Sequence, residues 1–169
     1  RGAFSGWSAR AAFNRGQILY RIAEMLEGRK DQFLEELKQL GYTPAAAKKE
    51  VEQSIDRLVY YAGWCDKYQQ LFSSVNPVAT SHFNFSVPEP MGVVAILADE
   101  SSALLGLVSV IAPAIAGGNT CIVLASESKP TCSITFAEVI ATSDVPGGVV
   151  NIVTGSRKEL HSHFSSHMD

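Results

Sequence analysis

Apolar runs and polar breaks in the middle of the chain predict a strand, a helix and a second strand. An apolar run at residues 93–97 is followed by a polar break at 99–102 and a long apolar segment at 104–116. Gly117-Gly118 ends that segment, and another apolar run covers residues 121–124. Strand, helix and strand within about 30 residues are typical of a βαβ unit. Such units build parallel sheets, which bind ligands at the carboxyl ends of their strands.

The same pattern recurs once toward the carboxyl end of the chain. Pro130 begins a second apolar helix, a Pro-Gly-Gly turn is expected at residues 146–148, and a third apolar run covers residues 149–153. Two consecutive crossovers predict three parallel strands with helices around them, which indicates the α/β class. The polar, histidine-rich tail at residues 156–169 predicts a short helix.

The amino-terminal part of the chain has the helical period instead. Apolar residues recur at helical spacing over residues 5–40, on both sides of Gly28, and Gly41 is expected to end this segment. Thr43 followed by Pro44 is typical of a helix start, and the apolar stripe of this second helix continues to Cys65. Neither segment gathers an acid, a base and a nucleophile, so we interpret both as helices that cover the sheet.

Residues 73–88 include a third pattern, in which apolar and polar residues alternate. Phe83, Phe85 and Val87 follow the period of two that a half-exposed strand shows. Prolines bracket this strand, which favours an edge or a protruding ribbon over a central strand. An exposed edge of this kind is a template for a protein partner. The alternative is a strand that covers the domain's own sheet.

Composition and charge narrow the class of protein. The chain has 169 residues, 46% of them hydrophobic and 18% charged, with a net charge of −3, which is typical of a globular domain. It has no basic run for nucleic acid, and its apolar segments are interrupted or too short to span a bilayer. It begins at Arg1 without a signal peptide, so we expect a fragment of a cytoplasmic protein. Cys65, Cys121 and Cys132 are widely spaced, which favours buried free thiols in a reducing compartment.

The glycine pairs, three histidines and two adjacent acids are weak candidates for a binding or catalytic site. The glycine pairs match no phosphate-binding motif and predict helix ends and turns. His161, His163 and His167 do not share one helix face, so we predict no metal site. Asp99 and Glu100 follow the first strand, where we expect a solvated turn or a helix start. Two acids there would favour the helix dipole and repel a pyrophosphate.

Five segments, which run in the family's order over nearly the whole chain, resemble the NAD(P)-dependent aldehyde dehydrogenases. They are Tyr60-Tyr61-Ala62-Gly63-Trp64 with Asp66-Lys67; Glu89-Pro90 with Gly92-Val93-Val94; Pro113-Ala114 with Gly118-Asn119-Thr120; Pro146 with Gly148-Val149-Val150-Asn151; and Val153-Thr154-Gly155. The resemblance implies the Rossmann-like cofactor domain of that family over residues 1–169. It also implies an oligomerisation ribbon at residues 73–88 and a catalytic domain that would follow Asp169.

The resemblance also implies which positions would carry the chemistry. Ser101 stands where the family has the asparagine that holds the oxyanion of the intermediate. Of the family's lysine and glutamate that grip the adenosine ribose of the cofactor, Glu127 is kept and Leu124 replaces the lysine. Arg157 and His161 fill two positions that are usually small. The family's catalytic cysteine and glutamate lie in later segments, and none of the three cysteines here stands at that position.

These departures lead to two hypotheses. The first is a non-catalytic module with a structural, oligomerisation or protein-interaction role and no cofactor, which is most similar to the degenerate second module of the two-module family 16 enzymes. The alternative is the cofactor-binding part of an NAD-dependent enzyme that oxidises aldehydes to carboxylic acids, with NAD held through Glu127 and the catalytic cysteine supplied elsewhere. We expect as partners a second copy, another module of the same protein, or a protein bound at the ribbon around Phe83–Val87. We expect neither nucleic acid nor membrane as a partner.

Overall fold

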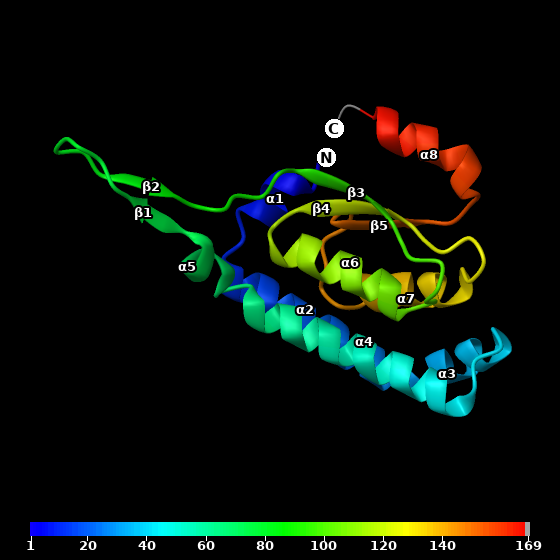
Figure 1. Ribbon diagram of the computed structural model, residues 1–169. Coiled ribbons are helices and arrows are strands. Elements are labelled where there is room, and N and C mark those ends of the chain that lie inside the picture. Colours follow the sequence, from blue (N-terminus) through cyan, green and yellow to red (C-terminus); the bar gives the residue numbers. More distant parts are fainter. Residues whose placement is uncertain (168–169) are drawn as a thin grey trace.

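A three-stranded parallel sheet lies against two layers of helices in the computed structural model, which describes residues 1–167 (Figure 1). The strands are β3 (Val93–Leu97), β4 (Thr120–Leu124) and β5 (Val150–Val153), in the order β3-β4-β5. These three strands confirm the predicted parallel sheet. The register pairs Val93 with Thr120 and Cys121 with Val150.

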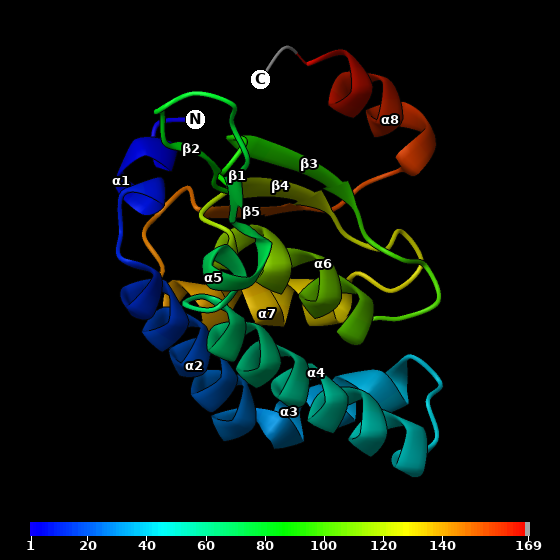
Figure 2. The same cartoon turned by 60° about the vertical axis from the view of Figure 1, so that its left-hand side comes forward.

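The two crossover helices lie on one face of this sheet rather than on both. They are α6 (Leu105–Ala116) and α7 (Thr131–Ala141). Both crossovers step across the sheet in the same direction, and right-handed crossovers that do so place their helices on the same side. The predicted crossover helices are therefore present, and together they cover a single face of the sheet (Figure 2).

The second layer of helices comes from the amino-terminal part of the chain. The expected helix at residues 5–40 is divided into α1 (Phe4–Ser8), α2 (Ala12–Gly28) and α3 (Lys30–Gln39). The next helix is α4 (Pro44–Trp64), and α2 and α4 pack against each other and against α6. The break after α1 allows Trp7 to enter the core, where its indole N–H donates to the carbonyl of Ile115 at 3.0 Å.

Local signals set the boundary between α3 and α4. Gly41 has φ +87°, and the N–H of Tyr42 bonds the carbonyl of Leu37 at 3.0 Å, which closes the end of α3 as predicted. The hydroxyl of Thr43 accepts a hydrogen bond from the N–H of Ala46 at 3.3 Å, and Pro44 is the first residue of α4.

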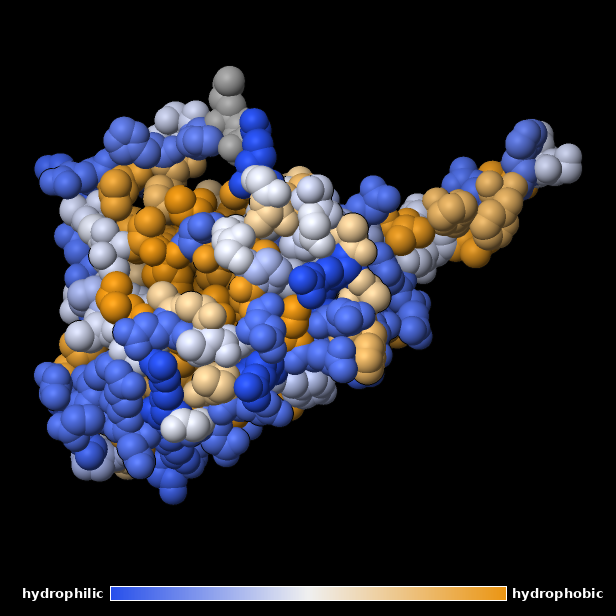
Figure 3. Space-filling model, turned by 180° about the vertical axis from the view of Figure 1, so that it is seen from behind, coloured by the Kyte–Doolittle hydropathy of each residue, from blue (hydrophilic) through white to orange (hydrophobic). Residues whose placement is uncertain are grey.

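The other face of the sheet carries a hollow of about 550 Å³. Figure 3 shows that apolar side chains gather in it. Val93, Ala95, Ile122 and Val153 line it from the strands. The last helix, α8 (Arg157–Ser166), contributes Phe164 at its rim.

The segment at residues 73–88 forms a hairpin that projects from the body (Figure 1). A short helix, α5 (Tyr68–Phe72), leads into β1 (Ser74–Asn76), which pairs antiparallel with β2 (Asn84–Ser86). The predicted protruding ribbon is thus confirmed. The predicted half-exposed strand was wrong, because both of its phenylalanines lie on the surface: Phe83 is 74% exposed and Phe85 is 59% exposed. The alternative of a strand that covers the domain's own sheet is also excluded, since β1 and β2 form a two-stranded sheet separate from β3-β4-β5.

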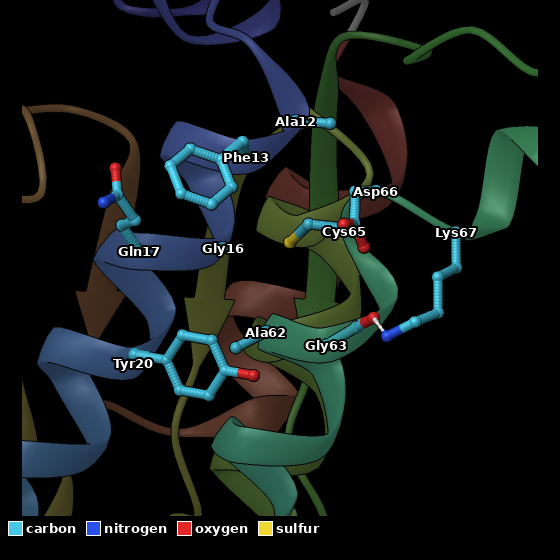
Figure 4. Close-up of a pocket in the computed structure, with 10 residues that line it drawn as sticks. All are labelled: Ala12, Phe13, Gly16, Gln17, Tyr20, Ala62, Gly63, Cys65, Asp66 and Lys67. Atoms are coloured by element: carbon cyan, nitrogen blue, oxygen red, sulfur yellow. Dashed lines mark hydrogen bonds between the residues drawn. The ribbon is translucent and has the colours of Figure 1, made fainter.

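The crossing of α2 and α4 depends on a glycine. A Cβ atom at Gly16 would lie 3.0 Å from the backbone oxygen of Ala62 and 3.6 Å from the Cβ of Cys65. Figure 4 shows Gly16 and Ala62 where the two helices face each other. The absence of a side chain at Gly16 therefore sets how closely the helices of the outer layer approach.

We expect Gly16→Ala to lower the free energy of unfolding by about 1 kcal/mol, because the added methyl group meets a backbone atom that cannot move alone. Gly28→Ala is the matched control: it lies in the same helix with nothing within 4 Å of the added atom. That control should be neutral or stabilising by up to about 1 kcal/mol, the usual helix preference for alanine. Urea unfolding measures both, and equal stabilisation by the two changes would contradict the close approach.

Candidate functional site

The loops at the carboxyl ends of the three strands meet at one edge of the sheet (Figure 2). They are residues 98–104 after β3, residues 125–130 after β4 and residues 154–156 after β5. Carboxyl ends of parallel strands are where α/β proteins bind ligands. Of the polar positions singled out from the sequence, Asp99, Glu100, Ser101, Glu127 and Arg157 lie in these loops or next to them.

Glu100 lies at the centre of this edge, in contact with the loop that follows β4. Its Oε2 accepts hydrogen bonds from the hydroxyl of Ser126 at 2.6 Å, and from the hydroxyl and N–H of Ser128 at 3.0 and 3.3 Å. Its Oε1 accepts from the N–H of Glu127 at 3.0 Å. Partial burial raises the pKa of Glu100, but these hydrogen bonds outweigh it and lower the pKa to about 2. The turn that holds Glu100 is thus partly solvated, with the side chain 36% exposed, and also hydrogen-bonded to the loop after β4.

Arg157 joins the third loop to the first two. Its Nε lies 2.7 Å from Oε1 of Glu100, and the two side chains are 34% and 36% exposed. The backbone N–H of Arg157 donates to a carboxylate oxygen of Glu127 at 3.0 Å, at the first turn of α8. Glu127, the candidate cofactor contact, therefore bonds the start of a helix of its own chain, where a carboxylate also favours the helix dipole.

Ser101, which the sequence resemblance assigns to an oxyanion position, is held by its neighbours. Its hydroxyl donates to the carboxylate of Asp99, and its N–H donates to the same carboxylate at 3.1 Å. These bonds lower the pKa of Asp99. The backbone carbonyl of Ser101 accepts a hydrogen bond from Nζ of Lys129 at 2.7 Å. The hydroxyl is thus directed to Asp99 rather than to a reacting carbonyl.

The start of α6 is capped by a residue that the sequence did not single out. Oε1 of Glu50, in α4, accepts hydrogen bonds from the N–H groups of Leu104 and Leu105 at 2.8 and 3.3 Å. It also accepts from the hydroxyl of Ser102 at 2.9 Å. Glu50, rather than Asp99 or Glu100, thus bonds the first N–H groups of this helix.

The remaining predicted positions do not line an open site. Leu124 is buried at the end of β4, and His161 is exposed on α8. Cys65, Cys121 and Cys132 are buried free thiols, as predicted. Burial raises their pKa to about 11, 12 and 12, so they stay protonated at neutral pH and are poor nucleophiles.

A separate pocket lies between α2 and the end of α4 (Figure 4). Phe13 and Tyr20 border it on one side, and Cys65, Asp66 and Lys67 on the other. Its volume is about 190 Å³, below the roughly 300 Å³ at which ligand pockets begin. It therefore offers no room for a nucleotide.

Neither a metal site nor a membrane-spanning helix is found among residues 1–167. No group of three His, Cys, Asp or Glu side chains in this range is placed to hold a metal ion. Within the same range, no helix has the length and apolar character needed to cross a membrane.

The sequence signals for this edge were unequal. Ser101, Glu127 and Arg157 could be singled out because the sequence resemblance assigns motif positions to them. Glu50 could not, because it lies 54 residues from the N–H of Leu104 that it bonds and belongs to no local pattern. The pairing of Glu100 with Arg157 was missed for the same reason.

Comparisons with known proteins agree with the fold. The Aldehyde dehydrogenase family model matches residues 1–169. Human mitochondrial 10-formyltetrahydrofolate dehydrogenase is 31% identical over 166 residues, which cover 96% of this chain and 18% of the relative. Cytosolic aldehyde dehydrogenase 1 of Elephantulus edwardii is 32% identical over 169 residues, 98% of this chain and 33% of the relative. The chain thus spans a third or less of the length of these relatives.

Solved structures of PnpE superpose on nearly the whole of this chain. PnpE from Pseudomonas sp. WBC-3 superposes with a TM-score of 0.92 at 27% identity, over 99% of this chain and 34% of that one. A structure of PnpE in complex with nicotinamide adenine dinucleotide gives a TM-score of 0.93 at 28% identity, with the same coverage.

We expect the bonds of Glu100 to stabilise the protein above pH 4.5 and to be lost as the pH falls toward 2. The pKa of Glu100 falls from 4.5 to about 2 on folding, so the unfolded state takes up the proton first and stability decreases across this window. Because solvent screens a pair this exposed, Glu100→Gln should cost about 1 kcal/mol at neutral pH. Urea unfolding at neutral pH and near pH 3 measures the cost and its decrease.

Glu159→Gln is the control, since it removes an exposed carboxylate from the first turn of α8, the helix that begins at Arg157. It should change stability by much less at either pH. A cost of Glu100→Gln that does not decrease with pH would contradict the assignment.

Proposed function

Because the chain belongs to the aldehyde dehydrogenase family, we propose that it is a non-catalytic, pseudoenzyme module of that family that contributes to assembly or protein interaction. One observation supports this most directly. The carboxylate of Glu100 accepts hydrogen bonds from the hydroxyl and N–H groups of residues 126–128, at the edge of the sheet where a ligand would bind.

The neighbouring residues also fit a dinucleotide poorly. An oxygen of Glu127 bonds the N–H of Arg157, and the hydroxyl of Ser101 bonds Asp99. Leu124, at the position of the family's lysine, is buried and offers no donor. A cofactor would have to displace these internal contacts before it gained its own. No cofactor is therefore part of this proposal.

The alternative function is that of a cofactor-binding part of an NAD-dependent aldehyde dehydrogenase. The structure of PnpE with its dinucleotide favours it, because the two folds superpose closely. In that case Glu127 would hold NAD, and the catalytic cysteine would come from another segment or module.

We also propose a cellular location and a subfamily for this protein. The relatives named above include a mitochondrial and a cytosolic enzyme, and we place this protein in the cytoplasm. The similarity to the second module of the two-module family 16 enzymes stays a prediction. It agrees with a module whose partner is another part of the same protein.

Calorimetry with NAD and NADP separates the two functions. We expect no binding of either dinucleotide at micromolar concentration, because the donors that would receive it are already bonded. PnpE, which has been solved in complex with nicotinamide adenine dinucleotide, serves as the positive control. A dissociation constant of about 10 μM or below, equivalent to about −7 kcal/mol, would contradict the proposed function and support the alternative.

The hairpin β1–β2 is the surface we propose for assembly. Val75, Phe83 and Phe85 are 69%, 74% and 59% exposed, and the rings of the two phenylalanines lie 5.4 Å apart. A projecting apolar ribbon with unpaired strand edges favours a protein partner. We propose a second copy of this chain or another module of the same protein as that partner, and neither nucleic acid nor membrane.

We expect Phe85→Asp to shift the protein toward the monomer in analytical ultracentrifugation, because the change places a charge within the apolar ribbon. Ile134→Asp is the matched control, since Ile134 is 53% exposed on α7, away from the hairpin. It should leave the sedimentation coefficient unchanged. A native protein that is monomeric at all concentrations, or an equal shift in both variants, would count against assembly through the ribbon.

A further inference from the structure

An aromatic groove lies at the foot of the hairpin, between α4, α5 and the end of α6. The ring of Trp64 stacks on that of Phe72, with centroids 6.5 Å apart, and the ring of Tyr60 lies 6.1 Å from that of Trp64. The groove has a volume of about 330 Å³ and is lined mainly by aromatic side chains: Tyr60, Tyr61, Trp64, Tyr68 and Phe72, with Pro113 of α6. Aromatic residues are enriched in protein interfaces and dominate their binding energy. The composition of the groove therefore favours a protein as its occupant.

Exposed apolar side chains join this groove to the hairpin. Leu71 and Phe72 of α5 are 64% and 68% exposed, and Val75 of β1 is 69% exposed. The helix α5 leads directly into the hairpin (Figure 1). Single exposed apolar residues are normal on a protein surface, but a continuous patch is typical of a site that binds another protein. The groove and the ribbon therefore belong to one interaction surface.

Both the ribbon and the groove lack the charged residues Asp, Glu, Lys and Arg. None occurs at residues 73–88, and none among residues 1–167 lines the groove. Exposed strand edges usually carry charges, lysine above all, which prevent pairing with another chain. This ribbon lacks that protection. Because the burial of an unpaired charge is costly, two uncharged surfaces can exclude water from each other without that cost. The ribbon and the groove are thus complementary in charge as well as in apolar character.

We propose that the aromatic groove receives the hairpin β1–β2 of a second copy of this chain, with Phe83 and Phe85 as the inserted rings. This inference rests on the proposed function and deepens it, because it names the surface that the ribbon binds. The hairpin projects away from the body (Figure 1), so each groove depends on the ribbon of another copy. Aromatic rings attract one another at centroid separations of about 4.5–7 Å, a geometry that the walls of the groove offer to an inserted phenylalanine. Two copies related by a twofold axis exchange both contacts at once and form a closed dimer.

Analytical ultracentrifugation of a groove variant tests the proposal. We expect Tyr60→Lys to raise the dissociation constant of the dimer by at least about tenfold, as the loss of an aromatic interface residue does. Tyr60 is 56% exposed, so the change leaves the packing of the core intact. Tyr20→Lys is the matched control, since Tyr20 is 44% exposed on α2 and borders the separate pocket of Figure 4. It should leave the dissociation constant at the native value.

A mixture of Tyr60→Lys with Phe85→Asp tests the pairing of the two surfaces directly. Each variant alone has a charge in both of its ribbon–groove contacts. In the mixed dimer one contact is native, and in the other an aspartate on the ribbon faces a lysine in the groove. We therefore expect the mixed dimer to dissociate at least about tenfold more weakly than the dimer of either variant alone.

Three results would overturn the inference: a dimer that Phe85→Asp separates but Tyr60→Lys does not, an equal weakening by Tyr20→Lys, or no recovery in the mixture. If Tyr60→Lys does not fold, Phe72→Lys takes its place, since Phe72 lines the same groove and is 68% exposed. A native protein that is monomeric at all concentrations would contradict assembly itself, and with it the proposed function. A native dimer that separates only in Phe85→Asp would overturn the groove alone and leave assembly through the ribbon in place.

Discussion

The rest of the structure depends on satisfying the two ends of α6, a nearly all-apolar helix between the sheet and the outer helices. A buried helix leaves N–H groups at its start and carbonyl groups at its end without partners, and each costs about 1–3 kcal/mol if it stays so. Glu50 accepts from the first N–H groups of α6. The side chains of Trp7 and Arg15 donate to its last carbonyls at 3.0 and 3.2 Å. The amino-terminal helices therefore complete the sheet domain chemically as well as cover it.

The capping of α6 also determines the arrangement at the carboxyl edge of the sheet. The loop after β3 is fixed at one end where the N–H of Ala98 bonds the carbonyl of Leu124 at 2.9 Å. It is fixed at the other end where Leu104 bonds Glu50. Between these points only a few residues remain, and they hold Glu100 against the loop after β4. The position of Glu100 thus follows from the packing of the helices and not from its own loop alone.

Most of the fold could be predicted from local sequence, whereas the contacts of the site could not. The three strands, the crossover helices and the end at Gly41 follow from periodicity and from residues with defined backbone preferences. The cap by Glu50 and the pairing of Glu100 with Arg157 join residues more than 50 positions apart, and no local pattern encodes them. The hairpin shows the limit of periodicity, because an alternating sequence fits both a half-buried strand and a free ribbon. Only the position of the neighbouring elements decides that Phe85 stays exposed.

These contacts satisfy the donors at the carboxyl edge of the sheet from within the chain itself. Loops that bind anions present N–H and hydroxyl groups, which lose stability if they are partly enclosed and have no acceptor. A carboxylate from the neighbouring loop provides that acceptor within the same chain, so folding does not require a bound molecule. The position of Glu100 between residues 126–128 and Arg157 also neutralises a guanidinium that is partly removed from solvent. The apolar layers and helix caps lie outside this exchange, which is why the sheet edge can change its chemistry while the architecture persists.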